Sequence, residues 1–285
     1  MIGALQDILT EAVDARLPSE LLDRIDELQA AIGDRPADDF GFTPEQIKYV
    51  VPIVEKVYRH WFRVEPIGME HIPAGRVLLI ANHSGQVPID AMMIATALIL
   101  DADPPRAVRS MVERWVPSLP FVSTFFSRLG QVLGTPENCR TLLAEEHPVL
   151  VFPEGVRGIN KTFDKAYQLQ GFGHGFMRLA LETNTPIVPV GVVGAEEQYP
   201  TPWNLKGLAK ALGLPAVPVP LNPFIPGLGM LPLPVKYRIY FGRPLTFIGD
   251  PDDDEAEIAA RVGVVRDAVD GLLRRGLLER QGWFR

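Results

Sequence analysis

A histidine and an aspartate stand seven positions apart in the segment Asn82-His83-Ser84-Gly85-Gln86-Val87-Pro88-Ile89-Asp90. The unperturbed pKa of histidine, roughly 6.5, suits a general base that removes the proton of a hydroxyl. A carboxylate at the other ring nitrogen would fix the tautomer and stabilise the imidazolium, as in a serine-protease triad whose hydroxyl comes from the substrate. His83 and Asp90 are therefore the candidate catalytic pair.

The spacing of this pair sets a condition on the local structure. Seven positions of an unbroken helix make about two turns, or roughly 10 Å, which is too far for a hydrogen bond between the side chains. His83 and Asp90 can therefore meet only if the intervening residues loop out, and Gly85 and Pro88 suit such a loop. The alternative interpretation is a surface loop after a buried strand, with His83 as a polar residue at its mouth.

A second motif, Val151-Phe152-Pro153-Glu154-Gly155-Val156-Arg157, follows about seventy residues later. The apolar run 148–152 suits a buried strand, and open α/β sheets place ligands at the carboxyl ends of such strands. Gly155 allows a close backbone approach, and Arg157 offers a planar fork for a phosphate or carboxylate. The alternative for Arg157 is an exposed loop arginine.

Together the two motifs resemble those of the glycerolipid and lysophospholipid acyltransferase family, of the 1-acylglycerol-phosphate acyltransferase type. The resemblance covers residues 68 to 242. The His-to-Asp spacing is longer than is usual in the family and looks like that of members related to the monoacylglycerol and diacylglycerol acyltransferases. Val156 stands where the family usually has threonine, so a hydroxyl contact to the acceptor is missing.

The resemblance implies an O-acyltransferase that moves a fatty acyl group from acyl-CoA or acyl carrier protein to a hydroxyl of a lysophospholipid or acylglycerol. His83 would be the base and Asp90 its orienter, with no acyl-enzyme and no cofactor besides the donor. Glu154, Gly155 and Arg157 would hold the acceptor. Backbone amides around Ser84 and Gly85, at a helix start, would stabilise the oxyanion.

Two other functions stay open at this point. A thioesterase or lipid hydrolase would activate water with the same His83 and Asp90, and only the acceptor site argues against it. A non-catalytic lipid-binding or acyl-CoA-binding protein would retain the fold, and the stretched spacing and Val156 favour it. No His, Cys, Asp or Glu cluster has the spacing of metal ligands, and neither a Gly-x-Ser-x-Gly elbow nor a nucleotide-binding motif is present.

Three further segments carry less chemistry. Segment 130–136 takes the place of an acceptor-binding block of the family but lacks its arginine, for which Arg128 or Arg140 could substitute. Segment 185–194 reads as a buried strand with a structural role. His174 precedes an apolar helix pattern, and a solvent-exposed helix start is favoured over a place in the site.

Short apolar strands alternate with helical stretches in the middle of the chain. We expect an α/β fold with a central mixed, mostly parallel sheet, glycerol-phosphate acyltransferase-like, with helices on both faces. The expected strands are 76–81, 107–112, 149–152, 187–193 and 237–242. The expected parts are an N-terminal helical segment (1–62), a catalytic domain (63–250) and a C-terminal amphipathic helix packed on the same domain (251–285).

The helices have recognisable starts and apolar faces. Leu21, Ile25, Leu28 and Ile32 form one stripe, and Thr43 is predicted to cap a second helix that Pro52 kinks. For the C-terminal helix, residues 252–254 supply the start and Arg274 and Arg275 suit its negative end. Its predicted buried stripe is Ile258, Val262, Val265, Val269 and Leu272.

Segment 200–235 is rich in proline and large apolar residues. Proline removes backbone donors, so this is an irregular connection rather than regular structure. It is either an apolar flap that lines an acyl channel or dips into a membrane, or a long connection packed on the core.

Composition limits the class of protein. With 285 residues, a net charge of −7 and a pI near 5.3, the chain is large enough for a full core and gives no support for nucleic-acid binding. The single cysteine, Cys139, fits a reducing compartment. No apolar run reaches the length of about 18 residues of a membrane span, and no signal peptide is recognisable. We expect a cytoplasmic protein, either free or peripheral on the inner face of the membrane.

Overall fold

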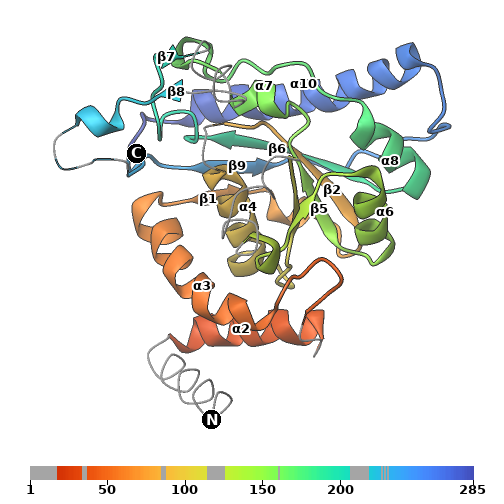
Figure 1. Cartoon of the computed structure of the whole chain (residues 1–285), viewed down its shortest axis with the longest axis horizontal. Coiled ribbons are helices and arrows are strands. Elements are labelled where there is room, and N and C mark those ends of the chain that lie inside the picture. Colours follow the sequence, from red (N-terminus) through yellow and green to blue (C-terminus); the bar gives the residue numbers. More distant parts are fainter. Residues whose placement is uncertain are drawn as a thin grey trace.

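The computed structural model describes residues 18–33, 37–84, 88–113, 126–159, 161–205, 218–225, 227, 229 and 231–285. A seven-stranded sheet in the order β1-β9-β6-β2-β5-β3-β4 forms its centre (Figure 1). The strands are β1 (Glu65–Ile67), β2 (Val77–Ala81), β3 (Arg109–Val112), β4 (Gln131–Leu133), β5 (Pro148–Val151), β6 (Ile187–Val193) and β9 (Arg238–Phe241).

The sheet is mixed and mostly parallel, as predicted. Only β6 and β9 pair in the antiparallel sense, and every other neighbouring pair is parallel. All five expected strands are present, with ends that differ by at most two residues. The sequence analysis missed β1 and β4, which have three residues each and are too short to show a periodic pattern.

Helices cover both faces of the sheet (Figure 1). One face carries α2 (Ser19–Ile32), α3 (Glu45–Lys56), the π-helical turn η1 (Val57–Trp61) and α4 (Ile89–Leu100). The other carries α6 (Pro136–Ala144), α8 (Gly175–Thr183) and α10 (Glu255–Glu279). The short helices are η2 (Met69–His71), α7 (Val156–Ile159), η4 (Phe163–Lys165) and η5 (Asn222–Phe224).

Strand β2 explains why the central strands are continuous apolar runs. All five of its residues are buried, with Val77, Leu79 and Ala81 in one hydrophobic cluster and Leu78 and Ile80 in the other. Because successive side chains of a strand point to opposite faces, a strand covered on both faces needs apolar residues at every position.

One detail of the predicted α3 helix is corrected. Thr43 does not cap it, because its hydroxyl donates instead to the Gly41 carbonyl at 3.3 Å, and Pro44 occupies the capping position without any side-chain hydrogen bond. Pro52 lies buried inside α3, and the chain continues past it into the turn η1.

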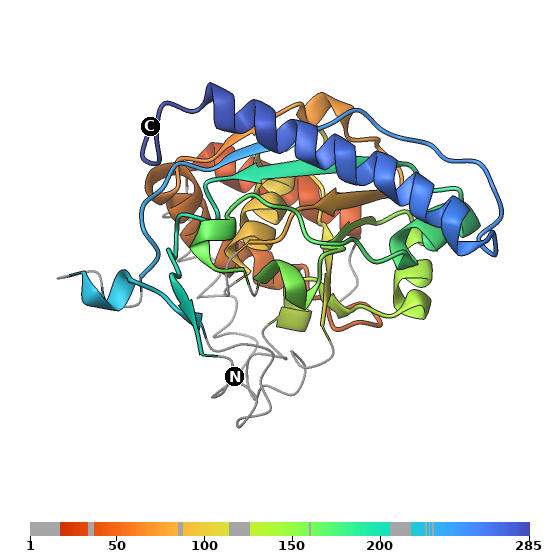
Figure 2. The same ribbon diagram turned by 90° about the horizontal axis from the view of Figure 1, so that it is seen from above.

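Helix α10 begins where expected but runs further than expected. The Asp254 carboxylate accepts the backbone N–H of Glu257 at 2.9 Å, which caps the helix. The buried stripe contains Leu273 in place of the predicted Leu272 and continues to Gly276. Arg274 and Arg275 do not lie in the last turn, because the helix continues to Glu279. Figure 2 shows α10 lying across the sheet, where it packs mainly on β6.

The described part of the proline-rich segment contains a short antiparallel ribbon, β7 (Trp203–Asn204) with β8 (Pro218–Val219). The buried Asn222 anchors the segment, since its amide donates to the carbonyls of Gln198 and Leu231 at 2.9 and 2.8 Å. Large apolar side chains nevertheless face solvent here, among them Trp203, Leu205, Phe224 and Leu231. The segment is thus fixed at its base and apolar on its surface.

Gly276 of α10 gives a direct test of the packing between helix and sheet. A β-carbon at this position would lie 2.6 Å from Tyr240 Cε2 and 2.8 Å from Val193 Cγ2. We expect Gly276→Ala to lower the free energy of unfolding by about 1–3 kcal/mol, measured by urea denaturation, because overpacking outweighs the better helix propensity of alanine.

Gly271 of the same helix is the matched control. A β-carbon there meets nothing within 4 Å, so we expect Gly271→Ala to raise stability by up to about 1 kcal/mol. Equal effects of the two substitutions would contradict the close contact at Gly276.

Candidate active site

The two motifs lie side by side because β2 and β5 are adjacent parallel strands. β2 ends at Ala81 and β5 at Val151, so the residues that follow emerge at the same edge of the sheet. Asn82 fixes the first of them. Its buried amide accepts the N–H of Val192 at 2.7 Å and donates to the Val192 carbonyl at 3.2 Å, which ties the end of β2 to β6.

The side chains of His83 and Asp90 meet, as the spacing condition required. His83 Nδ1 lies 2.8 Å from Asp90 Oδ2, although the residues stand in a loop and in the first turn of α4. A carboxylate can only accept, so Nδ1 carries the proton and Nε2 presents a lone pair. The Asp90 side chain is fully buried and that of His83 is 16% exposed, so one partner is fixed and the other can meet a substrate.

An aromatic ring also constrains His83. The Phe152 ring stacks on the imidazole with a centroid distance of 4.2 Å and an interplanar angle of 25°. Phe152 comes from the end of β5, so the second motif supports the ring of the first. This contact and the Asp90 hydrogen bond together restrict rotation of the imidazole about its side-chain bonds.

The expected oxyanion role of Ser84 is not supported by the geometry. Its backbone N–H donates to Asp90 Oδ2 at 2.9 Å, because a buried carboxylate needs donors, and it is therefore engaged. Helix α4 begins at Ile89, so Ser84 does not stand at a helix start. The Ser84 hydroxyl is buried without a hydrogen-bond partner among the described residues. Gly85 lies outside the described residues.

Glu154 holds the main chain of the site together. Its side chain is fully buried, and its two oxygens accept the backbone N–H of His83 at 3.0 Å and that of Gln170 at 2.7 Å. The sequence analysis assigned Glu154 to the acceptor. In the structure, its carboxylate instead connects the loop after β2 with the loop before α8, so Glu154 holds the backbone of His83 directly.

Two glycines allow the loops to approach one another. Gly155 has φ 54°, in the left-handed region that favours glycine. At Gly158 a β-carbon would lie 3.0 Å from the β-carbons of both Glu154 and His83. Gly158 was not identified from the sequence, because a glycine within a short helix has no special local signature.

The arginines divide between the site and the surface. Arg157 lies on α7, is exposed, and forms no ion pair with any residue that the structure describes, so its guanidinium is available for an anion. Arg140 is not brought to the site, because it pairs with Glu182 at 2.8 Å. Arg128 is exposed. His174 stands at the start of α8 and pairs with Glu255 at 2.7 Å, as the solvent-exposed interpretation favoured.

A buried ionic cluster beside Glu154 was missed by sequence analysis. Lys161 Nζ lies 2.7 Å from Glu196 Oε1 and 3.9 Å from Glu154 Oε2, and the Lys161 side chain is only 3% exposed. Burial raises the pKa of Glu196, and the neighbouring Lys161 opposes that shift. Residues 35 positions apart that pair without helical or strand periodicity give no signal in a single sequence.

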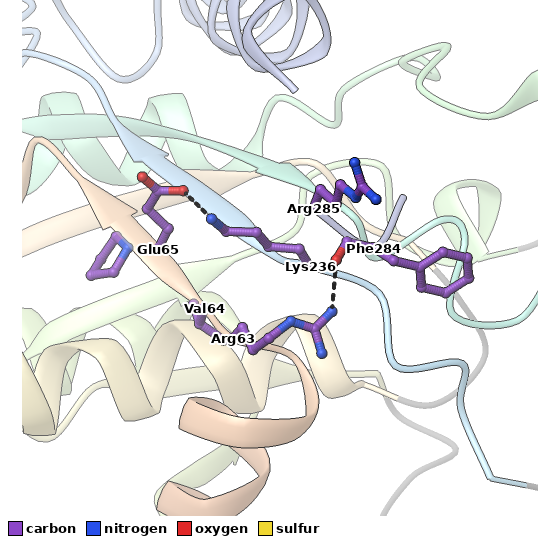
Figure 3. Close-up of a pocket in the computed structure, with 7 residues that line it drawn as sticks. Arg63, Val64, Glu65, Lys236, Phe284 and Arg285 are labelled. Atoms are coloured by element: carbon purple, nitrogen blue, oxygen red, sulfur yellow. Dashed lines mark hydrogen bonds and ion pairs between the residues drawn. The ribbon is translucent and has the colours of Figure 1, made fainter. Parts of the chain in front are cut away.

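The following features of the described residues give no second candidate for the active site. Among the described residues, no group of His, Cys, Asp or Glu side chains could hold a metal ion, and no helix is long and apolar enough to cross a membrane. A hollow of about 520 Å³ lies elsewhere, and none of the motif residues lines it (Figure 3). Its lining residues are Arg63, Val64, Glu65, Pro66, Lys236, Phe284 and Arg285.

Comparison with known proteins points to one family. The family model described as Acyltransferase matches residues 63–193, which include both motifs. An uncharacterized protein of Mycobacterium tuberculosis is 36% identical over 90% of this chain and 74% of its own length. A Gallus gallus protein named DGAT1/2-independent enzyme synthesizing storage lipids is 26% identical over 78% of this chain and 65% of its own length.

The fold agrees with this family. The crystal structure of the 1-acyl-sn-glycerophosphate (LPA) acyltransferase PlsC from Thermotoga maritima superposes with a TM-score of 0.52. The match covers 84% of this chain and 83% of that chain at 18% sequence identity. Sequence and fold therefore agree, and the protein belongs to the Acyltransferase family.

Proposed function

We propose that the enzyme transfers a fatty acyl group from acyl-CoA or acyl carrier protein to a hydroxyl of a lysophospholipid or acylglycerol. The observation that carries this proposal is the 2.8 Å contact between His83 Nδ1 and the buried Asp90 carboxylate. It leaves Nε2 as the basic atom of a partly exposed ring. A base of this kind, without a nucleophilic side chain beside it among the described contacts, suits direct attack by a bound hydroxyl.

The reaction balances with these residues alone. Nε2 of His83 takes the proton of the acceptor hydroxyl while the oxygen attacks the thioester carbonyl carbon. The resulting imidazolium donates its Nδ1 proton in the hydrogen bond to Asp90, whose negative charge stabilises it. When the tetrahedral intermediate collapses, the C–S bond breaks, and the leaving thiolate takes the proton from Nε2. The products are an ester and a free thiol.

The acceptor would lie along the second motif. Gly155 gives the turn its left-handed backbone, with φ 54°, and Arg157 offers an exposed guanidinium with the fork geometry that suits a phosphate. A mouse protein named 1-acyl-sn-glycerol-3-phosphate acyltransferase alpha is 26% identical over half of this chain, and the chicken storage-lipid enzyme is similarly distant. The name of the mouse protein supports a phosphate-bearing acceptor. The name of the chicken protein, which refers to storage lipids, supports a neutral one.

We further propose a cytoplasmic location with peripheral contact to a membrane. β6 ends and β9 begins at the edge of the sheet where β2 and β5 end, which is the edge that carries His83 and Glu154. The connection from β6 to β9 therefore starts and finishes at this edge. This connection exposes 59% of Trp203 and 71% of Phe224. Arg63 and Lys236 line the hollow at the starts of β1 and β9, which lie at this edge too, and Lys236 pairs there with Glu65 at 3.0 Å (Figure 3). Exposed apolar side chains at this edge suit a lipid surface.

His83→Ala tests the proposed base. We expect the variant to lower kcat by about 10²–10⁴-fold, because the acceptor hydroxyl then has no group to take its proton. Asp90→Asn should lower kcat in the same direction, since the tautomer of His83 is no longer fixed. The measurement uses a long-chain acyl-CoA with lysophosphatidate, monoacylglycerol or diacylglycerol, and follows free CoA together with acylated product.

His60→Ala is the matched control, because His60 is exposed in η1, and we expect no change in kcat. Transfer that survives His83→Ala would exclude the mechanism. CoA release that yields only free fatty acid, with every acceptor, would identify a thioesterase instead.

Arg157→Ala tests the nature of the acceptor. Charge-assisted hydrogen bonds contribute about 1.5–3 kcal/mol, so we expect KM for lysophosphatidate to rise by roughly 10-fold or more. KM for monoacylglycerol should stay unchanged. Arg274→Ala, which removes an exposed cation of α10, is the control. An equal change for both acceptors would show that Arg157 does not contact a phosphate.

The membrane contact is tested by co-sedimentation with phosphatidylcholine vesicles, with or without phosphatidylglycerol. We expect the double variant Trp203→Ser, Phe224→Ser to lower vesicle binding on the order of tenfold, because two large apolar contacts are lost. Ile248→Ser removes an even more exposed apolar residue beyond β9 at the opposite edge and should leave binding unchanged. Equal binding by all three proteins would rule out this surface.

A further inference from the structure

Three charged side chains share a buried space beside the catalytic loop. Glu154 is fully buried, Glu196 is 7% exposed and Lys161 is 3% exposed. The Lys161 ammonium lies between the two carboxylates, 2.7 Å from Glu196 Oε1 and 3.9 Å from Glu154 Oε2. Lys161 is thus the cation in contact with both carboxylates, and neither motif of the sequence includes it.

Burial makes this cation necessary for the charge of Glu154. A buried carboxylate without a nearby cation is costly, and two close carboxylates cannot both stay ionised easily. Burial raises the pKa of Glu196, and the nearby charge of Glu154 adds to that rise. With Lys161 present, one positive charge offsets this repulsion.

We propose that Lys161 is a positioning residue that keeps Glu154 ionised and thereby holds the main chain of His83 in place. Ionised Glu154 accepts the N–H groups of His83 and Gln170 at 3.0 and 2.7 Å, one on each oxygen. A protonated carboxyl has one oxygen fewer that accepts strongly, so one of these two contacts weakens. Lys161 touches no reacting atom in this scheme and acts through Glu154.

The other titratable groups nearby have partners of their own. Glu197 accepts from Arg280 and from the hydroxyl of Tyr167, and the Tyr167 ring lies under the Arg280 guanidinium with a distance of 5.4 Å. Burial raises the pKa of the Tyr167 phenol well above its usual range, so it stays neutral and donates. Asp90 is occupied by His83, and the Glu113 carboxylate lies near Gly155. None of these groups replaces Lys161 as a cation.

The inference rests on the proposed function and is tested by a double-mutant cycle. Lys161→Met replaces the ammonium side chain by an unbranched apolar one that is a single heavy atom shorter, and so removes the charge. We expect kcat to fall by about 10²-fold, the loss that a small displacement of a catalytic group causes, with little change in KM. Adding Glu196→Gln removes the second carboxylate, so kcat should recover at least tenfold. Lys165→Met, an exposed lysine four residues away, is the matched control.

The pH profile separates charge compensation from a merely structural role. Without Lys161 no cation offsets the repulsion between the two carboxylates, so the pair takes up a proton at a higher pH than before. Activity that needs ionised Glu154 is then lost earlier as the pH falls. We therefore expect the acid limb of the kcat profile to move to higher pH in Lys161→Met and to return in the double variant.

Amide hydrogen exchange of the His83 and Gln170 segments gives a readout that needs no turnover. Exchange should become faster in Lys161→Met and slow again in the double variant. If the wild type transfers no acyl group, the proposed function fails, whereas this exchange pattern still tests the role of Lys161.

Three results would overturn the inference. The first is a Lys161→Met protein with kcat, pH profile and exchange like those of Lys165→Met. The second is a loss that Glu196→Gln does not relieve. The third is failure of both the single and the double variant to fold, since Lys161 would then be needed irrespective of Glu196. Folding of the double variant alone would support charge compensation.

Discussion

The burial of the Asp90 carboxylate is the constraint on which the site depends. A buried charge needs donors, and this one receives the Nδ1–H of His83, the N–H of Ser84 and the N–H of Ala91. These three contacts draw the loop after β2 toward the first turn of α4. The positive end of the helix dipole adds to the stabilisation. The contact between His83 and Asp90 therefore follows from the need of one buried carboxylate for hydrogen-bond donors.

A second buried carboxylate, that of Glu154 after β5, also accepts a hydrogen bond from the loop that carries His83. Glu154 follows β5 and binds the main chain of His83, so His83 is held through its ring by Asp90 and through its backbone by Glu154. Asn82 ties the same stretch to β6. Three neighbouring strands thus converge on one residue. Such an arrangement is precise because its anchors follow directly on the ends of strands or stand in the first turn of a helix.

Local chemistry was readable from the sequence, whereas long-range pairing was not. The apolar runs indicated the buried strands. The spacing of His83 and Asp90 required a loop between them if their side chains were to meet, and the observed contact agrees with that requirement. The backbone amide of Ser84 was expected to stabilise an oxyanion. It donates to Asp90 instead, because the buried carboxylate needs hydrogen-bond donors. The pairing of Lys161 with Glu196 depends on how two distant loops fold together, and no single stretch of sequence records that.

The ring of Phe152 gives the site a sidedness. One face of the imidazole is covered by an aromatic plane at 4.2 Å, so no molecule can approach Nε2 through that face. The end of β5 therefore fixes a direction of approach as well as a position, because Phe152 makes the two faces of a planar ring inequivalent. A stacked phenylalanine thus gives handedness to a group that has none of its own.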